Sequence, residues 1–368
     1  AAQAKQAQMR AAFEKWAWSD PDRAERLAQI YNQKYNIWRR RQYNGDHLTI
    51  PGLSRNITPR SNQKNGAWRI LQSPTALLDH EVGAGKTLTC IIAAMEGKRL
   101  GLIRKAMVVA PNHLTHQWAN EVYKAYPHAR VLSVTSKDLS KERRGTFLSR
   151  ISTGNWDIII VPFSSFKLLP VSHDLEAEFI DEQIAQLEEY LWEMKAERHP
   201  SESMAASIKE IERAKKRFEL KIAMKMAMDK DSRETVTYEM LGVDMLVVDE
   251  FHAYKNLFFA TRMTRIAGLT NSESQRAFDM FMKVMWTVKR GGKVVAATGT
   301  PITNTLAEAF TMQRYMQYEL LKQQGLAHFD AWATQFALAE PGLEMTPDGA
   351  GFRMNTRFRK FVNMPELL

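Results

Sequence analysis

Residues 77–89, LLDHEVGAGKTLT, place two glycines, a lysine and a threonine directly after an apolar run. Backbone N–H groups freed by the glycines can point at phosphate oxygens, and the lysine adds a positive charge for the outer phosphates. The threonine hydroxyl is a ligand for a magnesium ion. The stretch therefore predicts a phosphate-binding loop for a nucleoside triphosphate and its Mg2+ ion, with candidate ligands Gly83, Ala84, Gly85, Lys86 and Thr87.

One position departs from the usual pattern of such loops, GxxxxGK[ST], because His80 stands where the first glycine is expected. The other three fixed positions, Gly85, Lys86 and Thr87, are present. Taken alone, the match leaves a chance loop open as the alternative. Its meaning therefore depends on residues further along the chain.

Two adjacent carboxylates end the most apolar stretch of the chain, MLVVDEFH at 245–252. A phosphate-binding loop needs an acidic partner on a neighbouring strand, and α/β proteins place ligand chemistry at the carboxyl ends of strands. We expect Asp249 to hold the magnesium ion together with Thr87, and Glu250 to polarise the attacking water. The alternative is an ordinary strand end with its charges in solvent.

A third candidate, AATGTPITN at 296–304, again follows an apolar run. The hydroxyl groups of Thr298 and Thr300 can hydrogen-bond to the acidic pair and so report the phosphate state to the rest of the domain. The alternative is a strand-to-helix turn in which Thr303 or Asn304 caps the next helix.

Six short apolar runs alternate with helical patterns, which indicates parallel strands covered on both faces. They are TALLD (75–79), KAMVVAP (105–111), ARVLSVT (129–135), DIIIVP (157–162), DMLVVDE (244–250) and KVVAATG (293–299), and a helix is expected from Leu306. The fold class is therefore α/β: a RecA-like domain with a phosphate-binding loop and a parallel central sheet flanked by helices.

The segment 174–237 interrupts this pattern. Residues 174–197 carry nine acidic residues and one lysine, whereas 209–233 carry nine basic and five acidic residues. Two helices of opposite charge, separated at His199-Pro200, predict an antiparallel helical hairpin inserted in the domain.

The chain is expected to have three parts. They are a basic, mostly helical N-terminal extension, the RecA-like lobe with its insertion, and a C-terminal helix with a loop tail, over residues 1–58, 59–325 and 326–368. In the extension, Ser19 or Asp20 followed by Pro21 predicts a helix start. The tail stretch EPGLEMTPDGAGF is expected to be a loop.

The net charge of +10 favours a polyanionic partner, nucleic acid first, although a merely soluble basic protein stays open. The run Arg39, Arg40 and Arg41 is a candidate for phosphate contact, with a solvated helix face as the alternative. No apolar run is long enough for a membrane span, and no signal peptide is visible. The single cysteine, Cys90, excludes an internal disulfide and is expected in the core.

In their order, HEVGAGKT, DEFH and ATGTPITN resemble motifs I, II and III of superfamily two helicases and translocases. The Swi/Snf-type translocases are the most similar, because Lys255 and Asn256 follow the acidic box as they do there. VVAPNHLTHQWANEV at 108–122 resembles motif Ia, with Pro111, Trp118 and Glu121 at its fixed positions, and IIIVPFSSF at 158–166 resembles motif Ib.

This resemblance, which covers roughly residues 60–320, implies ATP as the nucleotide and DNA as the partner. Gln63, 23 residues before Lys86, stands where the family reads adenine. The resemblance further implies that His252, Thr298 and Thr300 couple the ATP site to DNA. The implied contacts are to phosphates of double-stranded DNA, without sequence preference, from Asn112, His113, Gln117, Ser164 and Ser165.

The flanks, WSDPDRAERLAQIYNQKYN, LTIPGLS and WRILQ, resemble very large phage and plasmid proteins. In those proteins a helicase-like module is joined to a DNA methyltransferase and linked to antirestriction, which implies the cytoplasm of a bacterial or phage-infected cell, or a virion. These residues contain no methyltransferase motif. The roughly 50 residues after 320 are too few for the second RecA-like lobe with its arginine finger, so we expect weak ATP turnover by this chain.

Two other functions stay open. A non-catalytic, nucleotide-regulated scaffold would use the inserted hairpin as a docking arm for another protein. An RNA helicase lobe shares the same core motifs. The intact Lys86 and Glu250 disfavour the scaffold, and the Thr-Gly-Thr-Pro stretch disfavours the RNA helicase.

Overall fold

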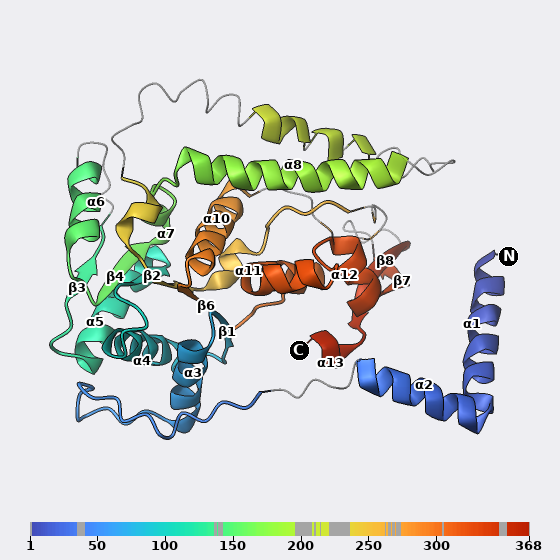
Figure 1. Ribbon diagram of the computed structural model, residues 1–368, viewed down its shortest axis with the longest axis horizontal. Helices are drawn as coiled ribbons and strands as arrows, with labels where there is room; N and C mark the ends of the chain where they lie inside the picture. The colour runs from blue at the N-terminus through green and yellow to red at the C-terminus, as the bar shows by residue number, and fades with distance from the viewer. Residues whose placement is uncertain are drawn as a thin grey trace. The chain divides into compact units, whose positions relative to one another are not determined.

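The central element of the computed structural model is one six-stranded sheet in which every pair of neighbours is parallel (Figure 1). The strand order is β1-β6-β5-β2-β4-β3. The strands are β1 (Thr75–Asp79), β2 (Ala106–Ala110), β3 (Val131–Ser133), β4 (Ile158–Pro162), β5 (Met245–Asp249) and β6 (Lys293–Thr298). All six lie within the predicted apolar runs, and the predicted α/β, RecA-like fold is confirmed.

The structure describes most of the chain. The described residues are 2–34, 41–135, 138, 143–195, 208–209, 211–213, 215–220, 236–261, 263, 266, 269, 274–303, 305–345 and 352–367. By its internal contacts the chain divides into a small unit, residues 1–42 with 361–368, and a large unit, residues 43–360.

The small unit is helical, as predicted for the N-terminus. Its helices are α1 (Ala2–Ser19), α2 (Pro21–Lys34) and α13 (Met364–Leu367). Asp20 Oδ1 accepts a hydrogen bond of 3.1 Å from the backbone N–H of Arg23, so Asp20 caps α2 and Pro21 takes its first position. Of the arginine run, Arg39 and Arg40 lie outside the described residues, and Arg41 is exposed.

Helices cover both faces of the sheet. Successive residues of a strand point to opposite faces, so each strand contributes to the apolar clusters on both sides. Met107 and Val109 belong to one apolar cluster, whereas Val108 and Ala110 belong to the other. The second cluster is closed by α3 (Ser61–Gln72), α4 (Lys86–Arg99) and α5 (Thr115–Ala125). The first is closed by α6 (Arg144–Thr153), α7 (Phe163–Phe166), α8 (His173–Lys195), α10 (Gln275–Lys289) and α11 (Ala307–Gln323).

The insertion forms the predicted pair of helices. Residues 208–209, 211–213 and 215–220 are helical and lie along α8. Lys195 pairs with Glu212 at 2.7 Å, and Glu188 pairs with Lys215 at 2.6 Å. The earlier residue of α8 therefore pairs with the later residue of the second helix. The pairing is therefore antiparallel, and the expected break at His199-Pro200 lies outside the described residues.

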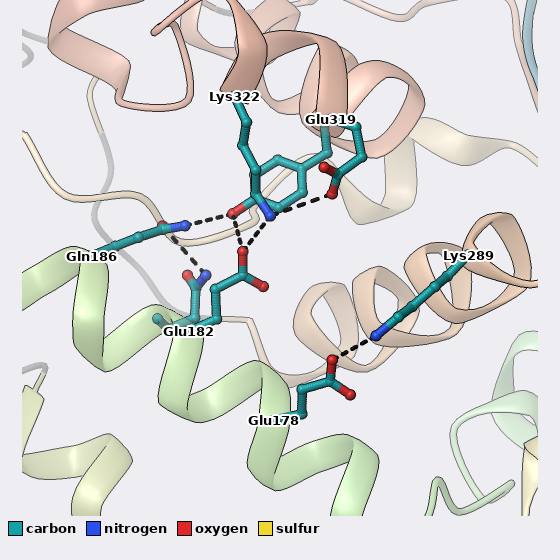
Figure 2. A network of polar contacts seen from close by, with 8 residues as sticks. Glu178, Glu182, Gln186, Lys289, Glu319 and Lys322 are labelled. Carbon is teal, nitrogen blue, oxygen red and sulfur yellow. Dashed lines mark hydrogen bonds and ion pairs between the residues drawn. The ribbon is translucent and has the colours of Figure 1, made fainter.

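Helix α8 docks on the lobe rather than standing free of it. Phe179 and Leu187 are buried in the core, and the ring of Phe179 contacts Phe281 of α10. Figure 2 shows polar contacts that also join α8 to neighbouring helices. They are the ion pairs Glu178–Lys289 at 2.6 Å and Glu182–Lys322 at 2.5 Å, and the hydrogen bond from Gln186 to the Tyr318 hydroxyl at 2.6 Å.

The C-terminal part corrects one prediction. Helix α12 (Phe329–Phe336) is present, but β7 (Ala337–Met345) and β8 (Phe352–Phe361) then form a two-stranded sheet where a loop tail was expected. In β8, large apolar residues alternate with arginines, as in Phe352, Met354 and Phe358, and this period of two is the signature of a strand. Pro341 is tolerated in β7 because a two-stranded sheet consists only of edge strands.

Within the described residues lie the short 3-10 helices η1 (Asn112–Leu114), η2 (Tyr238–Leu241) and η3 (Phe251–Tyr254). Among the described helices, none is long and apolar enough to cross a membrane.

Candidate nucleotide and nucleic-acid site

The predicted site residues follow the carboxyl ends of neighbouring strands. In the register of the sheet, Asp79 of β1 lies beside Thr298 of β6, and Ala297 of β6 lies beside Asp249 of β5. Next to β5 stand β2 and then β4, which precede η1 and α7. The sheet order therefore gathers at one edge five segments that lie far apart in the sequence.

The predicted phosphate-binding loop runs from the end of β1 to the start of α4. Gly83 and Gly85 have φ of 86° and 89°, in the left-handed region that favours glycine. The ammonium group of Lys86 donates to the backbone oxygens of His80 at 2.7 Å and Glu81 at 3.4 Å. The lysine side chain therefore folds back into the loop that precedes it.

His80 explains why the missing glycine is tolerated. Its φ is not positive, and its contribution to the loop is a backbone oxygen, which any residue provides. Burial, and then the charge of Lys86, lowers the pKa of the His80 imidazole. Its Nδ1 atom is buried and has no hydrogen-bond partner within the described structure.

The first turn of α3 lies against the loop. A Cβ atom on Gly85 would come within 1.9 Å of Gln63 Nε2, so only glycine fits there beside this side chain. Asn62 donates to the backbone oxygen of Ala84 at 3.3 Å. Gln63 Oε1 accepts from the backbone N–H of Arg60 at 2.8 Å, so Gln63 also closes the start of its own helix. Its role in reading adenine stays a prediction.

The Asp249 carboxylate is fixed at both oxygens. Trp118 Nε1 donates to Oδ2 at 2.8 Å, and the Glu250 backbone N–H donates to Oδ1 at 3.0 Å. Trp118 is 2% exposed and Asp249 is 8% exposed. Sequence reasoning placed Trp118 in a motif but gave it no role, because its partner lies 131 residues away.

Glu250 begins a chain of polar contacts. Its φ of 50° is in the left-handed region, a strained conformation of a kind that clusters at functional sites. Glu250 Oε2 lies 3.2 Å from His252 Nδ1, which lies 3.1 Å from Thr298 Oγ1. Thr298 Oγ1 also accepts from the backbone N–H of Thr300 at 3.1 Å. The structure thus brings together the acidic box and the three residues predicted to couple it.

Two further observations place the loop next to the acidic box and the third motif. Burial, then the negative charge of Asp249, raises the pKa of the Cys90 thiol, and Lys86 opposes this. The Asp249 carboxylate and the Lys86 ammonium group therefore both lie close enough to Cys90 of α4 to affect its thiol. A Cβ atom on Gly299 would lie 3.6 Å from Lys86 Nζ and 3.5 Å from the backbone oxygen of His80, so the third motif lies over the lysine.

The predicted DNA contacts divide into two groups. Asn112, His113 and Gln117 are exposed, and Asn112 Oδ1 accepts from the backbone N–H of Ser164 at 3.2 Å, which joins η1 to α7. Ser165 is 1% exposed. Its side chain lies in the core and is not available to a phosphate group, which corrects that part of the prediction.

Contacts between Lys255, Thr303 and Glu308 join the segment after the acidic box to the end of the third motif, and the sequence did not indicate them. Lys255 Nζ lies 2.6 Å from Thr303 Oγ1 and 2.8 Å from Glu308 Oε1. Thr303 donates its backbone N–H to Glu308 Oε2 at 2.6 Å. Leu306, not Thr303, is the cap residue of α11, and Asn304 lies outside the described residues.

Comparison with known proteins gives three results. No curated protein matches the chain. Two similar solved structures are the Sulfolobus solfataricus SWI2/SNF2 ATPase core in complex with dsDNA and the SWI2/SNF2 ATPase core domain from the same organism. Each is 15% identical, with TM-scores of 0.41 and 0.39; the matches cover 78% and 80% of this chain but only 40% and 42% of theirs.

The third result comes from protein families. Residues 1–37 match a domain of unknown function, DUF8437. Residues 68–368, most of the chain and every predicted site residue except Gln63, match the family "Probable helicase domain". The chain belongs to this helicase domain family.

Proposed function

We propose that this chain is the ATP-binding lobe of a DNA-dependent ATPase, a Swi/Snf-like translocase of superfamily two that couples ATP hydrolysis to movement on duplex DNA. The observation that carries the proposal is the meeting of three motifs at adjacent strand ends. Gly299 lies beside the Lys86 ammonium, and the contacts of His252 join Glu250 to Thr298.

The residues at this site fit a nucleotide phosphate chain. Gly83 and Gly85 hold the left-handed backbone that such a loop requires, and α4 begins directly after it at Lys86. The positive end of the α4 dipole therefore faces the loop. Lys86 now donates to backbone oxygens, and these bonds are ones that a phosphate oxygen can replace with a stronger, charge-assisted partner.

The donor set also fits Mg2+, which prefers oxygen ligands and is held by one or two protein groups together with phosphate oxygens. Thr87 offers a hydroxyl group, and each oxygen of Asp249 has one protein donor and keeps lone pairs for a metal or a water. When bound, the ion would neutralise charge on the outer phosphates.

Within the protein, Glu250 is the group placed to accept a proton from the attacking water. His252, held between Glu250 and Thr298, would orient that carboxylate and sense whether the third motif has moved. Asn112, His113 and Gln117, exposed at the same edge of the sheet, would contact DNA phosphates. A second RecA-like lobe of a larger parent protein would supply the arginine finger; a methyltransferase partner and an antirestriction role rest on the flank resemblance alone.

The proposal is tested by ATP hydrolysis of a longer protein that carries a second lobe, with single-stranded DNA, duplex DNA or RNA added. Stimulation by duplex DNA supports the translocase. Stimulation by RNA alone supports the RNA helicase instead. An unstimulated rate contradicts both, and a rate that survives Lys86→Ala contradicts the assigned site.

In the scaffold alternative, the insertion is a docking arm for another protein. The burial of Phe179 and Leu187 and the ion pairs of Glu178 and Glu182 argue against a free arm, because they fasten α8 to α10 and α11. Nucleotide binding with no hydrolysis in the two-lobed protein would favour the scaffold.

A further inference from the structure

Trp118 provides the only side-chain hydrogen bond to Asp249 among the described residues. The indole N–H is a donor without any acceptor capacity, so the bond has one possible direction. With the two side chains 2% and 8% exposed, water has little access to compete for the carboxylate. Together with the backbone N–H of Glu250, which bonds the other oxygen, this 2.8 Å bond fixes the rotation of the carboxylate group.

The position of Trp118 is itself determined by its surroundings. It lies one turn into α5, and its ring belongs to the apolar cluster beneath the sheet, with Ala119 and Val122. Just before α5, Asn112 is tied to Ser164. Because both the ring and the start of the helix are held, the indole presents its N–H to Asp249 from a rigid element.

We propose that Trp118 is a positioning residue, which holds Asp249 in the orientation that binds Mg2+ and thereby sets the affinity of the site for the metal. The inference rests on the proposed function, since it assumes that Asp249 is a magnesium ligand. A residue that only fills the core would affect stability and leave the metal dependence of nucleotide binding unchanged.

Trp118→Phe separates these roles, because phenylalanine keeps an aromatic ring and removes the donor. The matched control is Trp332→Phe. Trp332 is 0% exposed and donates Nε1 to Gln313 Oε1 at 2.6 Å, in α12 and α11, outside the nucleotide site. Both changes remove one indole hydrogen bond from a buried position.

The measurement is binding of a fluorescent, N-methylanthraniloyl-labelled ATP over a series of Mg2+ concentrations and in EDTA. For Trp118→Phe we expect the Mg2+ concentration at half-maximal binding to rise about tenfold, the lower end of the usual effect of a residue that orients a metal ligand. Binding in EDTA should stay within about twofold, and Trp332→Phe should match the wild type in both. In an Asp249→Ala background, Trp118→Phe should have no further effect.

An unchanged Mg2+ midpoint in Trp118→Phe overturns the inference while leaving the proposed function in place, provided that the wild type binds the labelled ATP with Mg2+. A wild type that does not bind overturns the proposed function and the inference with it. If Trp118→Phe does not fold, benzothienylalanine in place of Trp118 retains the shape of the ring without the N–H donor. The Mg2+ concentration at half-maximal binding of this variant then decides between a positioning and a purely structural role.

Discussion

Lys255 and Glu308 form an ion pair, with 2.8 Å between Nζ and Oε1, that joins the segment after the acidic box to the first turn of α11. Their side chains are 20% and 9% exposed. Glu308 also accepts two hydrogen bonds from Thr303, so one carboxylate holds both the end of the third motif and the segment after the acidic box. The loop that lies over Lys86 is therefore anchored at its far end.

Glu308→Ala should destabilise the protein by about 1–3 kcal/mol, because Lys255 and the Thr303 donors lose a shared, mostly buried acceptor. Urea unfolding measures the change. The control is Glu121→Ala, which removes an exposed ion pair with Lys124 and should cost less than about 1 kcal/mol. Equal losses in the two variants would show that the Glu308 contacts contribute nothing beyond a surface pair.

Lys86→Ala should weaken binding of labelled ATP with Mg2+ by about 10- to 100-fold, since the lysine is assigned a charge-assisted contact with the phosphates. His80→Gly is the matched change within the same loop. Position 80 contributes a backbone oxygen, so this variant should keep the wild-type affinity within about threefold. Strong loss of binding in His80→Gly would mean that the imidazole itself takes part.

Glu250→Gln should reduce hydrolysis by a longer protein that carries a second lobe about 10²- to 10⁴-fold, as expected when a group that accepts a proton is removed. The amide retains the size of the carboxylate, so binding of labelled ATP should change little. Turnover and equilibrium binding are measured on the same preparation. Glu319→Gln, a change of the same kind at an exposed carboxylate on α11, should leave turnover unaffected. If Glu250→Gln retains turnover, the water is activated by another group.

Much of the fold was predictable because the strands are continuous apolar runs, and only a buried parallel sheet requires such runs in alternation with helices. The location of the nucleotide site followed from residue types at strand ends. The hydrogen-bond partners of those residues could not be predicted from the sequence. Trp118 meets Asp249 only because β5 lies beside β2 in the sheet, and that order is not the order of the chain.

The missed strands have a different cause. Pro341 and Gly342 in β7 suggested a loop, since both residues are rare inside strands. The available signal was the sequence of β8, in which Phe352, Met354 and Phe358 are separated by even numbers of positions and arginines stand between them. The loop was predicted from the proline and glycine residues, whereas the alternating apolar residues of β8 correctly indicate a strand.

Lys283 and Lys289 lie on α10, and each pairs with a carboxylate, but only Lys283 is buried. Lys283 is 0% exposed, bonds Asp279 at 2.7 Å and donates to the backbone oxygen of Phe166 at 3.1 Å. Lys283→Ala should lower the free energy of unfolding by about 3–5 kcal/mol, because it leaves a cavity and removes the ammonium group that bonds the Phe166 backbone oxygen and the Asp279 carboxylate. Lys289→Ala, at a 66% exposed position, should cost less than about 1 kcal/mol.

Urea unfolding of the two lysine variants checks this difference. The contact of Lys283 with Phe166 also joins α10 to α7, the helix that contains Ser164. A small loss of stability in Lys283→Ala would indicate that α10 relaxes to fill the space. Lys283 would then not be needed to hold α10 against α7.

His80 should make the stability of the protein depend on pH. Burial, and then the charge of Lys86, holds the pKa of its imidazole below the ordinary value of 6.5. As the pH falls through 6.5, the unfolded chain binds the proton first, so the folded state loses stability until its own lower pKa is passed. The melting temperature of the wild type should therefore fall relative to that of His80→Gln between about pH 7.5 and pH 5. A difference that stays constant, or that grows in favour of the wild type at low pH, would contradict a lowered pKa for this half-buried imidazole, whose Nδ1 atom is buried without a partner among the described residues.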